Sequence, residues 1–223
     1  MFYIFSKSDF SDIKFARKVL LFFGSYALIV LGILISLLLI ASADYFVVNV
    51  LKYESIVNLI SVSTKEIGKE NILKIVIIVP IIEEILFRLI LKPKRFYVGI
   101  FTLFFSFYLL NGNFTNANFT EPIFYLKLSI AIIISTIIYL KGNFYVAFIK
   151  KNKTYFIVIS IMIFGLAHIS NIKPFHLQLI LFYPIFVIPQ IIIGYFITNI
   201  RLKLGFLWGI LLHCFVNLIN IYL

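Results

Sequence analysis

Residues 72–91 read ILKIVIIVPIIEEILFRLIL, a stretch that is apolar except for Lys74, Glu83, Glu84 and Arg88. A membrane-spanning helix needs about 20 mostly apolar residues to cross roughly 30 Å of hydrocarbon, and this stretch has that length. Ionisable side chains inside such a helix cost about 2.5–3.5 kcal/mol on insertion scales, so they are functional candidates by default. The stretch therefore predicts a membrane helix that carries functional groups near its middle.

The composition of the whole chain lies outside the range of soluble proteins. Of its 223 residues, 62% are hydrophobic and only 13% are charged, whereas a soluble domain averages about half apolar and about a quarter charged. The net charge of +11 comes mostly from basic residues that flank apolar runs, where they face lipid headgroups rather than nucleic acid. The composition predicts an integral membrane protein and excludes a soluble globule, a disordered chain and a nucleic-acid binder.

Further apolar stretches resemble the first one in length and composition. Together they predict an all-α fold, a polytopic transmembrane bundle of about seven to eight helices. The segment 44–71 mixes apolar and polar residues at helical spacing, which predicts an interfacial amphipathic helix. The expected spans are residues 19–43, 72–91, 97–110, 122–140, 154–170, 176–198 and 203–223.

The positions of lysine and arginine predict the orientation of the chain. With the N-terminus inside, most basic residues between spans fall on the cytoplasmic side, as the positive-inside rule requires. We expect a multi-pass protein of the cell membrane with a cytoplasmic N-terminus and an external C-terminus. No linker divides the sequence, so we expect a single membrane-embedded domain over residues 1–223. Its oligomeric state is left open.

The charged residues of the first stretch have a defined helical geometry. Glu84 and Arg88 are four residues apart and share one helix face, where they can form an ion pair. Glu83 lies about 100° around the helix from Glu84 and can point elsewhere. Pro80, one turn earlier, removes a backbone hydrogen bond and can open the helix.

Two further polar pairs lie inside later apolar stretches. Phe164 and His168 are four residues apart, as are His213 and Asn217, so each pair presents one helix face. At about 1.5 Å per residue, Glu83 lies roughly 16 Å from the outer end of its span. His213 lies roughly 15 Å, and His168 roughly 21 Å, from the inner ends of their spans. This similar depth is what a buried reaction site needs. Structural alternatives stay open, since histidines and asparagines also form hydrogen bonds between membrane helices.

The three pairs together resemble a known family. Glu83-Glu84-x-x-x-Arg88, Phe164-x-x-x-His168 and His213-x-x-x-Asn217, in this order on separate helices, are similar to the motifs of the CAAX-protease and bacteriocin-processing family (CPBP, or Abi). The homologous region would cover residues 70–220. The resemblance implies a conical helical bundle with a central intramembrane cavity and a glutamate-dependent peptidase site.

The resemblance also implies a role for each motif residue. Glu83 matches the catalytic glutamate, and His168 matches the histidine that helps to hold the attacking water. His213 and Asn217 match the pair proposed to stabilise the oxyanion. The supporting positions are Glu84, Arg88 and Phe164. The expected activity is an intramembrane endopeptidase that needs no cofactor and uses water activated by glutamate.

Other functions remain open from the sequence. Glu83, His168 and His213 could instead bind zinc, because glutamate with two histidines is a known catalytic zinc set, although no HExxH motif is present. The family also includes non-proteolytic membrane factors, such as bacteriocin self-immunity proteins and scaffolds. A proton-coupled carrier with Glu83 and His168 as a relay is a third possibility, although no inverted halves are recognisable.

The residue usage narrows the expected substrate. A chain rich in Ile, Asn, Lys and Phe indicates an AT-rich bacterial genome, and bacteria generally lack prenylated CAAX proteins. We therefore expect a peptide or a membrane-associated protein as substrate, such as a leader peptide, a pheromone precursor or a segment of a membrane protein.

Overall fold

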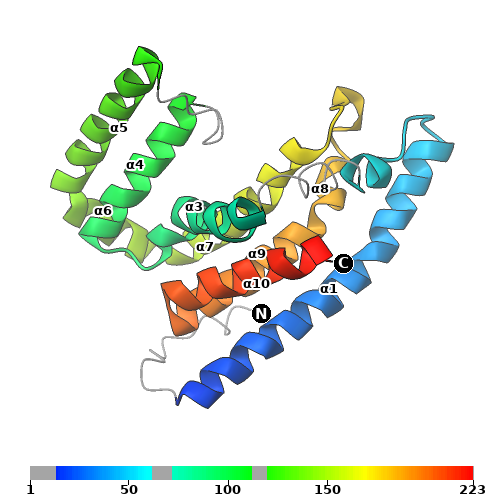
Figure 1. The fold of residues 1–223 in the computed structure, drawn as a ribbon, viewed down its shortest axis with the longest axis horizontal. Coiled ribbons are helices and arrows are strands. Elements are labelled where there is room, and N and C mark those ends of the chain that lie inside the picture. Colours follow the sequence, from blue (N-terminus) through cyan, green and yellow to red (C-terminus); the bar gives the residue numbers. More distant parts are fainter. Residues whose placement is uncertain (1–13, 62–71, 112–119, 223) are drawn as a thin grey trace. The chain divides into compact units, whose positions relative to one another are not determined.

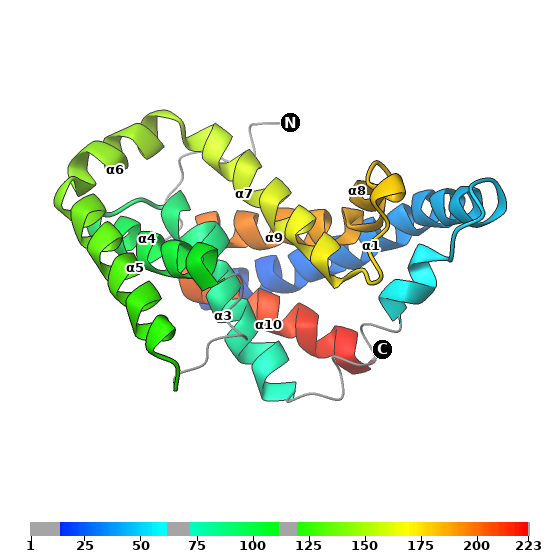
Figure 2. The same ribbon diagram turned by 90° about the horizontal axis from the view of Figure 1, so that it is seen from above.

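A computed structural model describes residues 14–61, 72–111 and 120–222 of the chain (Figure 1, Figure 2). Within these ranges the chain is helical and contains no strand, which confirms the predicted all-α fold. The chain divides into two compact units. The first unit comprises Met1–Ile81 and Ile159–Leu223, and the second comprises Ile82–Val158. The expected single membrane-embedded domain stays a prediction.

Several helices have the length and composition of membrane spans. Phe15–Asn49, Pro122–Leu140 and Lys153–Asn171 are long and apolar enough to cross a membrane, and Arg95–Asn111 and Phe206–Ile221 are shorter apolar helices. Only 17%, 11% and 28% of the most apolar windows of the three long helices are buried. Large exposed apolar surfaces of this kind are typical of a surface that contacts a membrane or another protein, and the span lengths agree with a membrane protein. The number of crossings and the central cavity stay predictions.

The first unit is built around three helices that lie side by side in both views (Figure 1, Figure 2). Aromatic rings join the first and last of them: the ring of Phe22 lies 5.7 Å from that of Phe215 and 6.1 Å from that of Trp208. The pair with Trp208 is edge-to-face and the pair with Phe215 is tilted, and aromatic pairs at such distances contribute beyond the area they bury. The three helices are α1 (Phe15–Asn49), α9 (Ile188–Leu204) and α10 (Phe206–Tyr222).

Helix α7 (Lys153–Ala167) approaches α9 closely through a glycine. A Cβ added at Gly165 would lie 2.3 Å from Ile191 Cγ1, 3.2 Å from the Ile191 nitrogen and 3.3 Å from its Cα. Two of these three atoms belong to the α9 backbone, which cannot rotate away. The glycine therefore sets the distance between the two helices.

We expect Gly165→Ala to destabilise the protein by about 1–3 kcal/mol, because the added methyl overpacks the α7–α9 contact. The matched control is Gly24→Ala on α1, where an added Cβ meets nothing within 4 Å. Alanine is the better helix former, so this control should gain about 0.5–1 kcal/mol. Denaturant unfolding in detergent micelles measures both changes. Equal stability of the two variants would contradict the close approach at Gly165.

The segment after α1 is partly helical. Asp44, near the end of α1, accepts hydrogen bonds from the backbone N–H of Ile56 at 2.8 Å and from the Ser55 hydroxyl at 2.8 Å. It thereby satisfies an N–H that the first turn of the helix over residues 56–61 leaves without a helical partner. Residues 44–49 belong to α1 instead of a separate helix, and residues 62–71 lie outside the described ranges. The interfacial helix expected over 44–71 therefore stays a prediction.

The second unit contains a hairpin of two helices and a third that follows it. The Ser135 hydroxyl donates to the Gly99 carbonyl at 2.8 Å, and Arg95 donates from Nε to the Tyr139 carbonyl at 2.8 Å. The Arg95 guanidinium also lies 4.5 Å from the centre of the Tyr139 ring. These contacts fix the register of the hairpin. The helices are α4 (Arg95–Asn111), α5 (Pro122–Leu140) and α6 (Gly142–Lys151).

The span predicted over residues 176–198 is wrong in its first half. The chain forms only two short turns there, η7 (Leu177–Leu179) and α8 (Tyr183–Phe186), and the long helix α9 begins at Ile188. Pro184 and Pro189 explain the break, because a proline has no N–H to donate and is tolerated in the first turn of a helix. The predicted span was based on apolar length and did not take these two prolines into account.

The last predicted span, residues 203–223, begins later than expected. Helix α9 runs on to Leu204, and Gly205 then has φ 107°, which residues other than glycine rarely adopt. The Gly205 N–H still donates to the Arg201 carbonyl at 3.1 Å. Helix α10 therefore starts at Phe206.

Candidate active site

The stretch over residues 72–91 is helical, as predicted, but it consists of four consecutive pieces. A π-helical turn on each side flanks a short α-helix whose last residue is Glu83. Within an α-helix, π turns are rare and occur frequently at functional sites. The pieces are η3 (Lys74–Ile78), α3 (Val79–Glu83), η4 (Glu84–Arg88) and η5 (Leu89–Leu91).

Pro80 explains why the first π turn needs help from another helix. At the end of η3 the N–H of Val79 donates to the carbonyl of Lys74, five residues back. The next bond in this register would run from residue 80 to Ile75, but Pro80 has no N–H. The side chain of Asn217 on α10 takes that place, since its Nδ2 donates to the Ile75 carbonyl at 3.1 Å. Ile75, Pro80 and Asn217 all belong to the first unit.

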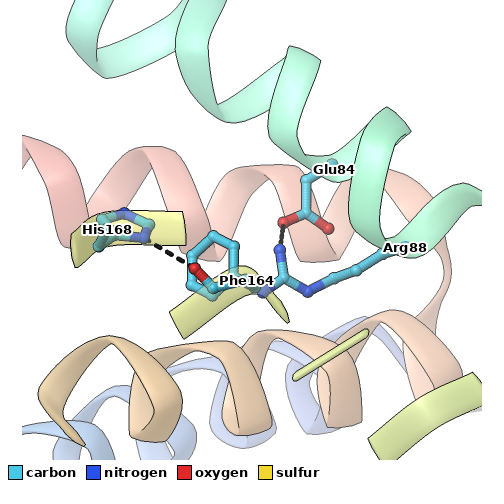
Figure 3. A network of polar contacts seen from close by, with 4 residues as sticks. All are labelled: Glu84, Arg88, Phe164 and His168. Atoms are coloured by element: carbon cyan, nitrogen blue, oxygen red, sulfur yellow. Dashed lines mark hydrogen bonds and ion pairs between the residues drawn. The ribbon is translucent and has the colours of Figure 1, made fainter. Parts of the chain in front are cut away.

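Glu84 and Arg88 form the ion pair that their spacing predicts. Arg88 Nη1 donates to Glu84 Oε1, and both side chains are fully buried (Figure 3). A charge removed from water needs a partner of opposite sign, and this pair supplies one within a single helical turn. Glu83, the neighbouring residue, is half-buried. The three residues belong to the second unit.

Phe164, His168 and His213 lie together in the first unit. The ring of Phe164 is 4.9 Å from that of His168 and 5.6 Å from that of His213, in edge-on arrangements. Phe164 is 1% exposed and His213 is 2% exposed, so these two rings lie in a packed interior, whereas His168 is half-buried. The structure thus brings residues of two predicted motifs, on α7 and α10, into one cluster.

The end of α7 determines which nitrogen of His168 carries a proton. His168 is the first residue of the short turn η6 (His168–Asn171), and its Nδ1 lies 2.8 Å from the Phe164 carbonyl oxygen (Figure 3). The last carbonyls of a helix have no helical partner, so a side chain can take one. A carbonyl only accepts, so Nδ1 must donate. In the neutral ring, Nε2 then carries the lone pair and can accept a proton.

A comparison with family models confirms the family that the sequence resembles. The model of the type II CAAX prenyl endopeptidase Rce1-like family matches residues 71–219, about two thirds of the chain. The chain belongs to this family. Neither curated proteins nor solved structures gave a match.

Membership in the Rce1-like family makes the chain a CAAX-type intramembrane protease in general terms. The long apolar helices agree with a membrane protein. The matched region contains all of the motif residues named above. The orientation of the termini and the roles of individual residues stay predictions.

The site residues of this Rce1-like chain fall into two groups. The first unit holds Phe164, His168, His213 and Asn217, and the second holds Glu83, Glu84 and Arg88. Within either unit, no three His, Cys, Asp or Glu side chains of the described residues gather as a metal ion would require. The alternative zinc set takes Glu83 from the second unit and both histidines from the first, so it stays an alternative.

One contact of the candidate site could not be predicted from the sequence. The Ile75 carbonyl is engaged by Asn217, yet a backbone carbonyl has no signature of its own in a sequence. The one feature of the sequence that pointed to this contact was Pro80. A proline in a helix interior has no N–H, so one carbonyl of the preceding turn is left without a backbone donor. That signal does not say which carbonyl is left or which side chain reaches it.

Proposed function

We propose that the chain is an intramembrane endopeptidase in which Glu83 acts as general base on a water molecule that attacks the peptide bond. Membership in the Rce1-like family supports peptide hydrolysis. The single observation that carries the mechanism is the hydrogen bond of His168 to the Phe164 carbonyl. It leaves Nε2 of His168 as the nitrogen that can hold the same water or accept its proton.

The remaining motif residues support the reaction in this proposal. His213 donates a hydrogen bond to the oxygen of the tetrahedral intermediate, and loss of one such donor typically costs about 10²–10³ in rate. Arg88 balances the charge of the buried carboxylate of Glu84. The two adjacent acids therefore have different tasks: Glu84 is held in an ion pair, and Glu83 handles the proton.

The substrate in this proposal is a peptide or a membrane-associated protein. The experiment compares the membrane peptides of cells that carry the wild-type protein with those of cells that carry Glu83→Gln. We expect peptides that appear only with the wild type. Identical peptide sets would contradict proteolysis and favour a non-proteolytic factor. A peptide found in this way then serves as the substrate of the purified protein in liposomes.

The chemistry of the purified protein can be tested in water labelled with oxygen-18. We expect one labelled oxygen in the new carboxyl terminus and none in Glu83, because water attacks the peptide directly. Label in Glu83 after a single turnover would show a covalent glutamyl intermediate and contradict the general-base mechanism.

We also expect a strong zinc chelator to leave the cleavage rate of the purified protein unchanged. A loss of activity that added zinc restores would favour the zinc alternative.

A further inference from the structure

Asn217 makes a contact that does not depend on any substrate. Its Nδ2 donates to the Ile75 carbonyl at 3.1 Å, across 142 positions of the sequence. The amide of Asn217 is half-buried, and Ile75 lies in the middle of the η3 turn. A neutral hydrogen bond of this kind contributes modestly when it is formed, whereas a carbonyl left unsatisfied in an apolar setting costs more.

The contact replaces a backbone hydrogen bond that Pro80 cannot make. The η3 register pairs each N–H with the carbonyl five residues back, as the bond from Val79 to Lys74 shows. In this register the backbone N–H of residue 80 would donate to the Ile75 carbonyl. Proline has no N–H, so this hydrogen bond cannot form. Membrane helices tolerate proline because neighbouring helices satisfy the backbone groups that it leaves open. Asn217 is the neighbour that does so here.

The position of the contact along the helix links it to the reaction. Helix α3 begins at Val79, directly after η3, and Glu83 is its last residue. An anchor on η3 therefore fixes the start of the short helix that ends at the proposed base. A shift of about 1 Å at a reacting group can cost about 10²-fold in rate, even when its cause lies away from the chemistry.

We propose that Asn217 is a positioning residue: it occupies the carbonyl that Pro80 leaves open and thereby holds the helix that carries Glu83. The inference rests on the proposed function, because it takes Glu83 as the general base. It gives Asn217 a task other than that of an oxyanion donor. The amide has a second N–H, so the two tasks must be separated by experiment.

A double-mutant cycle with Pro80→Ala separates them. Alanine at position 80 restores a backbone N–H that can serve the open carbonyl, so the anchor is no longer needed. We expect Asn217→Ala alone to lower kcat by about 10²-fold, with KM little changed. We expect Pro80→Ala to stay within about twofold of the wild type, and Asn217→Ala to have an effect within about twofold in the Pro80→Ala protein.

Each other outcome of the kinetic cycle contradicts the proposal. If Asn217 instead donated to the oxyanion, Asn217→Ala would lower kcat by about 10²–10³-fold with either proline or alanine at position 80. The reacting oxygen does not depend on the hydrogen-bond register of η3. A merely structural contact would lower the melting temperature and leave kcat per folded protein unchanged. A folded Pro80→Ala protein without activity would also show that restoring the N–H does not replace the anchor.

Thermal unfolding of the same four proteins gives a second readout that needs no substrate. We expect Asn217→Ala to lower Tm clearly in the Pro80 protein and only slightly in the Pro80→Ala protein. Equal shifts in both would show that the amide does not serve the carbonyl that Pro80 leaves open, and this would overturn the anchor. The proposed function fails separately, if the wild type does not cleave or if Glu83→Gln cleaves equally well.

Discussion

Glu83→Gln should lower kcat for peptide cleavage by about 10²–10⁴-fold, the usual contribution of a general base. Glutamine has nearly the same shape as glutamate, but its amide cannot accept the proton of the attacking water. Glu83 is half-buried and ends α3 between two π turns, so the substitution leaves the backbone bonds of that segment in place. Cleavage of the identified peptide by purified protein in liposomes measures the effect.

The matched control for this prediction is Glu54→Gln. Glu54 is exposed and lies in the segment between α1 and the helix over residues 56–61, so the same chemical change is made outside the motifs. We expect its kcat to equal that of the wild type. Both variants should insert into the membrane and elute as the wild type does on size exclusion. Equal turnover by Glu83→Gln and the wild type would refute Glu83 as the base.

Arg88→Met should destabilise the protein by about 3–5 kcal/mol, the usual cost of removing one partner from a buried ion pair. Methionine keeps much of the length of the arginine side chain but leaves the Glu84 carboxylate buried without this guanidinium. Both side chains are fully buried, so water cannot replace the lost partner easily. Chemical unfolding in detergent micelles measures the change in the free energy of unfolding.

Two further variants test the cause of this loss. Arg17→Met removes an exposed arginine from α1, and we expect a change within about 0.5 kcal/mol. The double variant Glu84→Leu with Arg88→Met removes both charges, and we expect it to recover most of the lost stability. A double variant as unstable as Arg88→Met alone would show that lost packing, not the buried charge, causes the effect.

Local spacing was enough to predict much of the fold. The helix over residues 122–140 was predicted to the residue from the length of its apolar run, and the structure places Pro122 in its first turn, where proline is well tolerated. The Glu84–Arg88 pair was predicted from a separation of four residues, and the structure confirms it. The contact of His168 with Phe164 has the same separation. In both of these pairs the interacting groups lie about one turn apart on the same stretch of helix.

Apolar length was a less successful guide at two other stretches. Residues 176–186 are apolar enough for a span, yet they form short turns before α9 begins at Ile188. The stretch over residues 72–91 was expected as one helix and contains two π turns. Hydropathy reports how well a segment avoids water, but the hydrogen-bond register depends on which N–H groups exist and which neighbours can replace them.

Residue types and their spacing were sufficient to predict that the chain is helical and apolar, and which motif residues share a helix face. Periodicity and residue type act over one or two turns, so these properties need no knowledge of the fold. The packing of the Phe164 ring against His213 and the hydrogen bond from Asn217 to the Ile75 carbonyl became known from the folded chain. Those contacts join distant parts of the chain, and packing between helices selects them, since many other pairs in the sequence have the same chemistry.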